Sequence, residues 1–413
     1  MALRYVSSFL SHSWKQKNFV LGLARELTRR GMLAWIDQNE LPVGINLDHE
    51  LRKANEKQLT VTAVITEDSL ASSWCNDELK VRIEAAGEDG ADAIIPIFVG
   101  RPLALVKSSP LLRTRWLSPD GASVRRLFAE VPDTAAEHLP GLARRIAATH
   151  YERLGLQKAP RVLIAFDQRG KKRRLGRLDE DIVPSNWLDQ DWPTLVFRPD
   201  QGERSPFEVC AGDAWTSFRD TVVDALGEAL GTRRRREVYI AGNGQLAFAW
   251  LAGTIFDRSC GARVSTFNMT RGGQFLSLDM DDPRFQVPLQ PMEESEVRWQ
   301  DDVRPDDTTA SVSAYMGPAP FEGAVHQHRK QAADTTPLAL RHTDAIGTPD
   351  DVIALARWLA TVAQGRALTL YTSVPFHAVV LLAGLTKHQI GRVTLMEWQR
   401  ASSSYTPCVM PEA

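Results

Sequence analysis

The sequence contains few cysteines, and they do not cluster. Cys75, Cys210, Cys260 and Cys408 lie far apart and form no C-x-x-C pair, which argues against a zinc ribbon or a disulfide framework. No run of about 18 apolar residues occurs, and residues 1–16 hold no apolar stretch of signal-peptide length. We therefore expect a reduced, cytoplasmic protein without a membrane span.

Neither sign of charge is in excess. The chain carries 49 Lys+Arg and 51 Asp+Glu, a formal charge of −2, which argues against a protein that coats nucleic acid along its whole surface but leaves room for local basic patches. No DNA partner is expected. The 413 residues are 43% hydrophobic and 24% charged, which is ordinary for a folded globular protein. At roughly 150 residues per domain, the length predicts two or three domains.

The first part of the chain alternates strand and helix patterns. Strands are predicted over residues 4–10, 32–36, 59–66 and 93–99, and helices over 16–30, 47–54 and 73–86. The segments LTVTAVIT and AIIPIFV are almost wholly apolar, as is typical of central parallel strands covered on both faces. This order predicts a doubly wound parallel α/β sheet, whose ligands bind beyond the carboxyl ends of the strands.

A second region follows a helical stretch at residues 139–154. It has strand patterns at residues 161–166, 194–199, 237–241, 263–268, 367–371 and 392–397 and helix patterns at 217–230, 246–255 and 378–385. Residues 348–351 (Thr-Pro-Asp-Asp) predict a further helix start, with a threonine cap, an early proline and carboxylates near the positive end of the helix dipole. Residues 280–310 are acidic and proline-rich and are predicted to form a surface excursion.

The second region contains an internal echo. Residues 236–258 and 366–385 both run from a basic residue through a strand and a tight turn to an apolar helix. Two related strand–turn–helix units predict two Rossmann-like halves that face each other, although two ordinary βα units could match by coincidence.

One helix of the first part combines an aromatic residue with a carboxylate. Trp74 and Glu78 are four residues apart and share a helix face, so the ring can hold a flat base while the carboxylate addresses a sugar. Glu84 lies roughly 240° round the helix from Glu78 and off that face. Trp74 equally suits a role as a packing anchor, and Cys75 is expected to be a small buried side chain rather than a nucleophile.

Four segments in order resemble the Toll/interleukin receptor (TIR) domain, over roughly residues 3–130. They are FLSHS, WIDQNELPVG with LDHELRKA, S-x-x-S-S-W-C-x-x-E-L and IIPIFVG. The third is very similar to the version in NAD-cleaving TIR proteins, in which the glutamate four residues after the tryptophan is catalytic; here it is Glu78. The resemblance also implies a flavodoxin-like fold and an NAD+ site lined by Phe9, Ser11, His12, Asp37 and Trp74.

The chemistry of NAD+ cleavage needs only one carboxylate. Nicotinamide is already a cationic leaving group, so no general acid is required, and a nearby carboxylate stabilises the oxocarbenium-like transition state. NAD+ would be the substrate, with no cofactor and no metal ion.

Two further segments resemble the SAVED domain, a fused pair of CARF-like Rossmann halves that senses cyclic oligonucleotides. They are EVYIAGNGQLAFAWLAGTIFD and RALTLYTSVPFHAVVLLAGL. Their turns place backbone N–H groups at helix starts, where phosphates bind, and aromatic residues nearby can stack on bases. The candidate ligand residues are Gly242, Asn243, Gln245, Pro375, Phe376 and His377, although such turns and the neighbouring Arg runs equally occur as ordinary surface features.

The predicted organisation is a TIR domain at residues 1–135, a connecting helix at 136–155 and a SAVED domain at 156–405. The resemblances imply a bacterial anti-phage effector of the CBASS type. A cyclic oligonucleotide, with a trinucleotide favoured, would bind the SAVED domain, drive oligomerisation and activate hydrolysis of NAD+ to nicotinamide and ADP-ribose. A non-enzymatic TIR scaffold and a TIR enzyme regulated by another partner remain alternatives.

Overall fold

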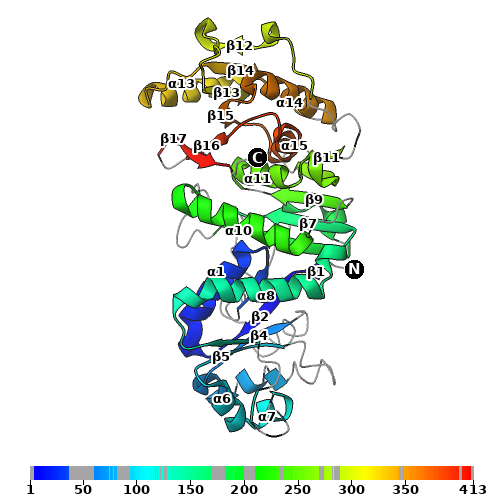
Figure 1. Cartoon of the computed structure of the whole chain (residues 1–413), viewed down its shortest axis with the longest axis vertical. Helices are drawn as coiled ribbons and strands as arrows, with labels where there is room; N and C mark the ends of the chain where they lie inside the picture. The colour runs from blue at the N-terminus through cyan, green and yellow to red at the C-terminus, as the bar shows by residue number, and fades with distance from the viewer. Residues whose placement is uncertain are drawn as a thin grey trace.

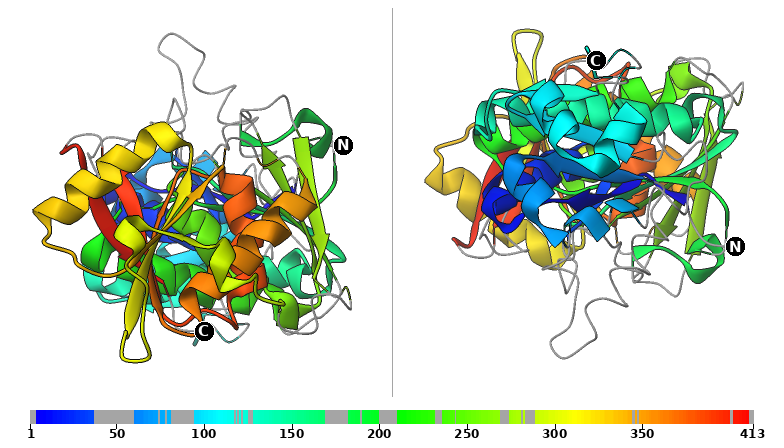
Figure 2. Two further views of the ribbon diagram at one scale, coloured as in Figure 1. Left: turned by 90° about the horizontal axis from the view of Figure 1, so that it is seen from above. Right: turned by 90° about the horizontal axis from the view of Figure 1, so that it is seen from below.

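The structure of the chain is a computed structural model. It describes residues 4–36, 60–73, 75–77, 79–80, 94–116, 118, 120, 122–124, 128–168, 182–188, 190–199, 210–231, 236–242, 244–268, 274–280, 282, 289–343, 346, 348–399 and 402–410. Three α/β layers follow one another along the long axis of the molecule, each built on one sheet (Figure 1). Seen along that axis, the layers lie over one another (Figure 2).

The first sheet is parallel throughout, with strand order β3-β2-β4-β5-β6. Its strands are β2 (Ser7–Ser11), β3 (Leu33–Trp35), β4 (Val61–Ile65), β5 (Ile94–Val99) and β6 (Ala129–Val131). Alternate residues of these strands pack on α1 (Lys17–Arg29) and α8 (Leu139–Arg153) on one face, and on α6 (Pro102–Ser108) and α7 (Pro110–Trp116) on the other. The predicted doubly wound sheet is therefore confirmed.

The strand predicted over residues 4–10 is divided at Val6. Its first two residues form β1 (Arg4–Tyr5), which pairs with β8 (Pro193–Phe197) of the second sheet rather than with the first. Val6 lies between the two strands and bonds to both sheets, because its N–H donates to the carbonyl of Thr194 at 3.0 Å and its carbonyl accepts from Leu33 N–H at 2.8 Å. The chain thus ties the first layer to the second at its start.

The second and third sheets share the topology of their last five strands and differ at the first strand of the order, where β1 pairs parallel with β8 and β12 pairs antiparallel with β14. The second sheet has the order β1-β8-β7-β9-β10-β11 and the third β12-β14-β13-β15-β16-β17. In each, four neighbouring parallel strands are followed by an antiparallel edge strand at the end of the order. The strands of the second sheet are β7 (Arg161–Phe166), β8, β9 (Glu237–Gly242), β10 (Arg263–Asn268) and β11 (Gln274–Asp279). Those of the third are β12 (Arg298–Trp299), β13 (Ser311–Gly317), β14 (Leu338–His342), β15 (Ala367–Thr372), β16 (Val393–Gln399) and β17 (Ser404–Val409).

The helices repeat as well, so the predicted pair of Rossmann-like halves is present. The helices α10 (Gly212–Leu230) and α11 (Leu246–Ile255) of the first half correspond to α14 (Pro349–Ala363) and α15 (Phe376–Thr386) of the second. The residues that precede α11 and α15, Gln245 and Pro375, have nearly identical backbone angles, with φ −57° and ψ 146° against φ −58° and ψ 147°. The short helix α9 (Ser185–Leu188) covers the outer face of the second sheet, and the helix α13 (Glu322–Gln331) covers that of the third.

The layers are joined by helices. Helix α8 packs on α1 and α10 between the first and second sheets, and α11 packs on α15 between the second and third (Figure 1). The predicted cap of α14 is confirmed, since Thr348 Oγ1 accepts from Asp351 N–H at 3.3 Å and Asp351 Oδ2 accepts from Thr348 N–H at 2.9 Å. Within the described residues, no helix combines the length and apolar character that crossing a bilayer requires. The domain boundaries stay a prediction.

A buried polar cluster fastens α8 to the first sheet. Nε2 of His150 lies 2.9 Å from Thr60 Oγ1, and Ser8 Oγ lies 2.8 Å from Thr62 Oγ1 and donates to the carbonyl of Thr60 at 3.2 Å. His150 is only 1% exposed. Burial, and to a smaller extent the charge of Arg153, lowers its pKa to about 3. The imidazole is therefore neutral in the folded protein.

We expect this histidine to make the protein acid-sensitive. An unfolded histidine takes up a proton near pH 6.5, whereas folded His150 does so only near pH 3, so the unfolded chain binds more protons between these values and stability falls as pH falls. From pH 7 to pH 5 the contribution is a loss of about 2 kcal/mol. Urea unfolding of the wild type and of His150→Gln at both pH values measures it. An equal loss in the variant would contradict the assignment.

Candidate functional site

Strand β2 and the residue that follows it include three of the predicted NAD+ residues. Phe9 is buried within β2, and its ring lies 5.1 Å from that of Trp35 at the end of β3. Ser11 ends the strand and is also buried, and Nδ1 of the half-buried His12 lies 3.0 Å from the carbonyl of Leu10. These residues therefore lie where β2 and β3 end, as the parallel sheet predicts.

The segment that carries the W-x-x-x-E motif lies against this loop. Ser72 caps it, since Ser72 Oγ accepts from Cys75 N–H at 3.4 Å, and residues 75–77 and 79–80 are helical. Cys75 is buried, and its thiol donates to the carbonyl of His12 at 3.3 Å. This contact joins two of the four segments that resemble the TIR domain.

Asn76 fixes the corner between this segment and the preceding helix α4 (Glu67–Ala71). Its side-chain amide donates to the carbonyls of Leu70 at 2.8 Å and Ser72 at 2.9 Å. Sequence reasoning did not single out Asn76, although an amide just after a serine cap suits such a turn. Asp37, Trp74, Glu78 and Glu84 lie outside the described residues, so their roles stay predictions.

The second candidate site lies at the carboxyl edge of the second sheet. The side-chain amide of Gln245 pairs with that of Gln168, which follows β7, with Nε2 of Gln168 donating to Oε1 of Gln245 at 3.1 Å. Gln245 also accepts from Cys210 N–H at 2.6 Å and donates to the Cys210 carbonyl at 3.1 Å. Only 1% exposed, the Gln245 side chain is engaged by protein groups.

Four other predicted residues lie where the two halves touch. Phe376 packs over Gly242, where an added Cβ would lie 2.4 Å from its ring, and the rings of Phe376 and Phe166 are 6.5 Å apart. Pro375 precedes α15, and the carbonyl of His377, which is buried, accepts from Thr266 Oγ1 at 3.2 Å. Asn243 lies outside the described residues.

A carboxylate of the second half occupies the start of α11. Glu397 on β16 is buried, and its Oε1 accepts from Ala247 N–H at 2.5 Å. A negative charge there is favoured by the helix dipole. The position at which the sequence suggests phosphate binding is thus filled by a side chain 150 residues away in the chain, which no local pattern could predict.

An ion pair lies at the same edge. Asp167 follows β7 and Arg198 follows β8, and Arg198 Nη2 and Nε lie 2.6 and 3.0 Å from Asp167 Oδ2. Sequence reasoning did not select them, although both come directly after a buried strand, the position that marked the candidates of the first domain.

Aromatic residues gather at the carboxyl ends of β15 and β16. The ring of Tyr405 lies 5.1 Å from both Tyr371 and Trp398 and 5.4 Å from His328. Tyr371 is buried, and burial raises its pKa to about 12. Trp398 is the exposed member of the cluster.

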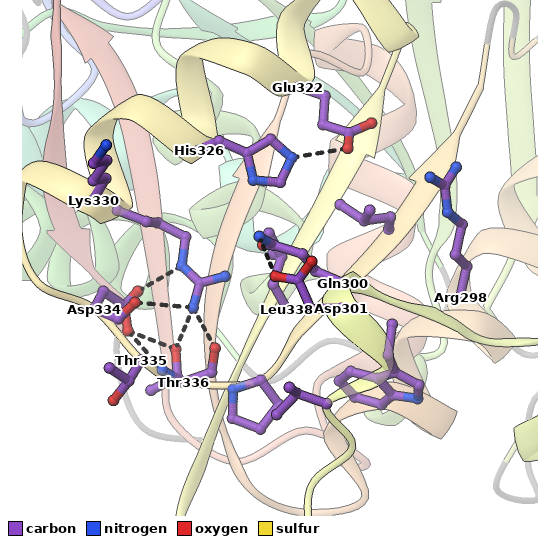
Figure 3. A pocket seen from close by; sticks show the side chains of 15 residues that line it. Arg298, Gln300, Asp301, Glu322, His326, Lys330, Asp334, Thr335, Thr336 and Leu338 are labelled. Carbon is purple, nitrogen blue, oxygen red and sulfur yellow. Dashed lines mark hydrogen bonds and ion pairs between the residues drawn. The ribbon is translucent and has the colours of Figure 1, made fainter.

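A cavity of about 610 Å³ lies between α13, β12 and β14, away from the predicted sites. Glu322 accepts from His326 at 2.9 Å and from His342 at 2.6 Å, and these groups lower its pKa against the effect of burial. Asp334, which forms an ion pair with Arg329, lies at the other side of the cavity (Figure 3). In the described part of the chain, no group of three or more His, Cys, Asp or Glu residues is arranged to hold a metal ion.

Comparison with known proteins identifies the first layer. Residues 9–128 match the family model of the TIR domain. The chain is 35% identical over 95 residues to the NAD(+) hydrolase TcpC of Escherichia coli O6:H1, a match that covers 22% of this chain and 30% of that protein. The chain thus spans under a third of this relative. The N-terminal part of the present chain is a TIR domain.

Solved structures of SAVED/CARF-domain receptors are similar over most of the chain. One is the Acinetobacter baumannii Cap4 SAVED/CARF-domain containing receptor with the cyclic trinucleotide 2′3′3′-cAAA, at 12% identity and a TM-score of 0.38, covering 89% of this chain and 86% of that one. Another is the Moraxella osloensis Cap4 receptor, at 10% identity and a TM-score of 0.37, covering 95% of this chain and 97% of that one.

Proposed function

We propose that the TIR domain hydrolyses NAD+ and that the two Rossmann-like halves switch it on when they bind a cyclic oligonucleotide. The contact between Cys75 and His12 carries the enzymatic part, because it brings the first loop against the segment that bears Trp74 and Glu78. The similarity of this domain to an NAD(+) hydrolase supports the same reaction.

In the proposed reaction the bond between the nicotinamide nitrogen and C1′ of the ribose breaks. The bonding electrons leave with neutral nicotinamide, water adds to C1′, and a proton passes to solvent, so the products are nicotinamide and ADP-ribose. Glu78 stabilises the positive charge that develops on the ribose. The residues proposed to bind NAD+ are Phe9, Ser11, His12, Asp37 and Trp74.

The proposed activator site lies where the two halves meet. Phe376 at the start of α15 packs over Gly242 at the end of β9, so the repeated strand–turn–helix units meet there, which suits a ligand made of repeated nucleotides. A cyclic trinucleotide is the preferred candidate. Ligand binding would drive self-assembly, as in a two-state system whose assembled state binds the ligand more tightly. The biological role would be a cytoplasmic CBASS-type effector that depletes NAD in phage-infected bacteria.

The test measures NAD+ consumption by the full chain with cyclic di-, tri- and tetranucleotides, together with its mass in solution. We expect cleavage with one class of cyclic oligonucleotide and a larger assembly under the same conditions. Activity without a change in mass would remove the assembly step. If no ligand of the panel induced NAD+ cleavage, the non-enzymatic scaffold would be favoured. Strong salt-dependent binding of linear RNA would favour a different partner.

A further inference from the structure

The second sheet holds the TIR domain through the backbone of β8. Val196 N–H donates to the carbonyl of Gly31 at 2.8 Å, and Arg198 N–H donates to the carbonyl of Thr28 at 3.1 Å. Gly31 has φ +77°, and a Cβ on it would lie 2.8 Å from the Phe197 ring. The end of α1 and the turn after it are therefore fixed on the end of β8.

Arg198 also binds the side chain of Asp167, at the carboxyl edge of the second sheet. Its guanidinium binds Asp167 Oδ2, with side-chain exposures of 12% for Arg198 and 3% for Asp167. Asp167 Oδ1 is buried and makes no hydrogen bond in the described part of the chain. One oxygen thus receives both N–H groups while the other is unsatisfied, which is a costly arrangement for a buried carboxylate.

Asp167 is also next to the candidate ligand residues. Gln168, its neighbour in the chain, accepts from Gln245 N–H at 2.7 Å through Oε1. The ion pair and the Gln168–Gln245 pair therefore lie side by side on the edge to which the proposed ligand binds. A guanidinium binds a phosphodiester with the same planar fork that it offers to a carboxylate.

We propose that Arg198 binds a phosphate of the activating oligonucleotide and that Asp167 occupies this position until the ligand arrives. The inference rests on the proposed function. Exchange of the carboxylate for a phosphate would move the guanidinium of a residue whose own N–H holds the last turn of α1. The other end of α1 follows the loop of Ser11 and His12, so the exchange takes place one helix away from the proposed NAD+ pocket.

The test compares Asp167→Asn, Arg198→Lys and the wild type in binding 3′3′3′ cyclic tri-adenylate. Asp167→Asn removes the competing charge and should tighten binding of the ligand about tenfold, which corresponds to the free energy of one charge-assisted hydrogen bond. NAD+ cleavage by this variant should then begin at a lower ligand concentration. Arg198→Lys should weaken binding by a similar factor because lysine lacks the fork. Asp334→Asn is the control, since it breaks the similar Arg329–Asp334 pair far from this edge.

The melting temperature separates a ligand site from a merely structural pair. Without ligand, we expect Asp167→Asn to have a lower melting temperature than the wild type. On adding cyclic tri-adenylate, the melting temperature of the variant should rise by more than that of the wild type. Lower stability with unchanged affinity, or unchanged affinity in Arg198→Lys, would overturn the inference and leave the proposed function intact. If the wild type bound neither cyclic tri-adenylate nor any other cyclic oligonucleotide of the panel, both would fall.

Discussion

Glu78→Gln is expected to lower NAD+ cleavage by on the order of 10³-fold or more while leaving cyclic-oligonucleotide binding unchanged. The amide keeps the size and hydrogen-bonding capacity of the side chain but removes the negative charge that opposes the cation forming on the ribose. Because that charge acts on the transition state, the loss should appear in kcat rather than in KM alone. The measurement is nicotinamide release by the full chain at saturating activator.

Asp77→Asn is the matched control. Asp77 is the exposed neighbour of Glu78 in the same segment, so its removal changes the net charge equally without affecting a predicted catalytic group. The control should retain near wild-type activity, and both variants should melt at the same temperature. Full activity of Glu78→Gln would mean that the motif has been assigned to the wrong carboxylate, and Glu84 would be replaced next.

Most of the first sheet could be predicted from sequence because its central strands are buried on both faces. β4 and β5 appear in the sequence as continuous apolar runs, which few other structures produce. The division at Val6 could not be predicted. A strand pattern reports which residues are apolar but not which neighbour they pair with, and here the pairing changes to β8, almost 190 residues away.

Elements of the third layer escaped sequence analysis for local reasons. Strand β17 contains Pro407, which is tolerated only because β17 is an edge strand, and α13 is mostly polar, with only Val325 and Arg329 buried. Neither segment shows the periodicity that marks β16 or α14.

The sequence predicted where the candidate residues lie in the fold, but not which groups their side chains contact. Gln245 and His377 were selected as residues at helix starts, which is where the structure places them. Their side chains are nevertheless buried, because tertiary packing supplies partners such as Cys210. Contacts between residues so far apart in sequence leave no trace in local patterns, which is also why the Asp167–Arg198 pair was missed.

Gly253→Ala is expected to destabilise the paired halves by about 3 kcal/mol or more. Gly253 lies in α11 where that helix crosses α15, and an added Cβ would lie 2.0 Å from the carbonyl oxygen of Val380 and 2.7 Å from Cβ of Ala383. The first obstacle is backbone, so no side-chain rotation can relieve it. The helices would have to separate, which would open the buried contact between α11 and α15. Calorimetric unfolding of the full chain measures the loss.

Gly227→Ala provides the comparison. Gly227 also lies within a helix, α10, but a Cβ there meets no atom within 4 Å. Alanine should therefore stabilise the protein by roughly 0.5–1 kcal/mol through its higher helix propensity. If alanine lowers stability at Gly253 but raises it at Gly227, then the close approach of the two helices, and not helix propensity, determines the requirement for glycine at Gly253. Since Phe376 and Gly242 meet at the same interface, Gly253→Ala should also weaken cyclic-oligonucleotide binding; equal stability and binding in both variants would disprove the tight α11–α15 crossing.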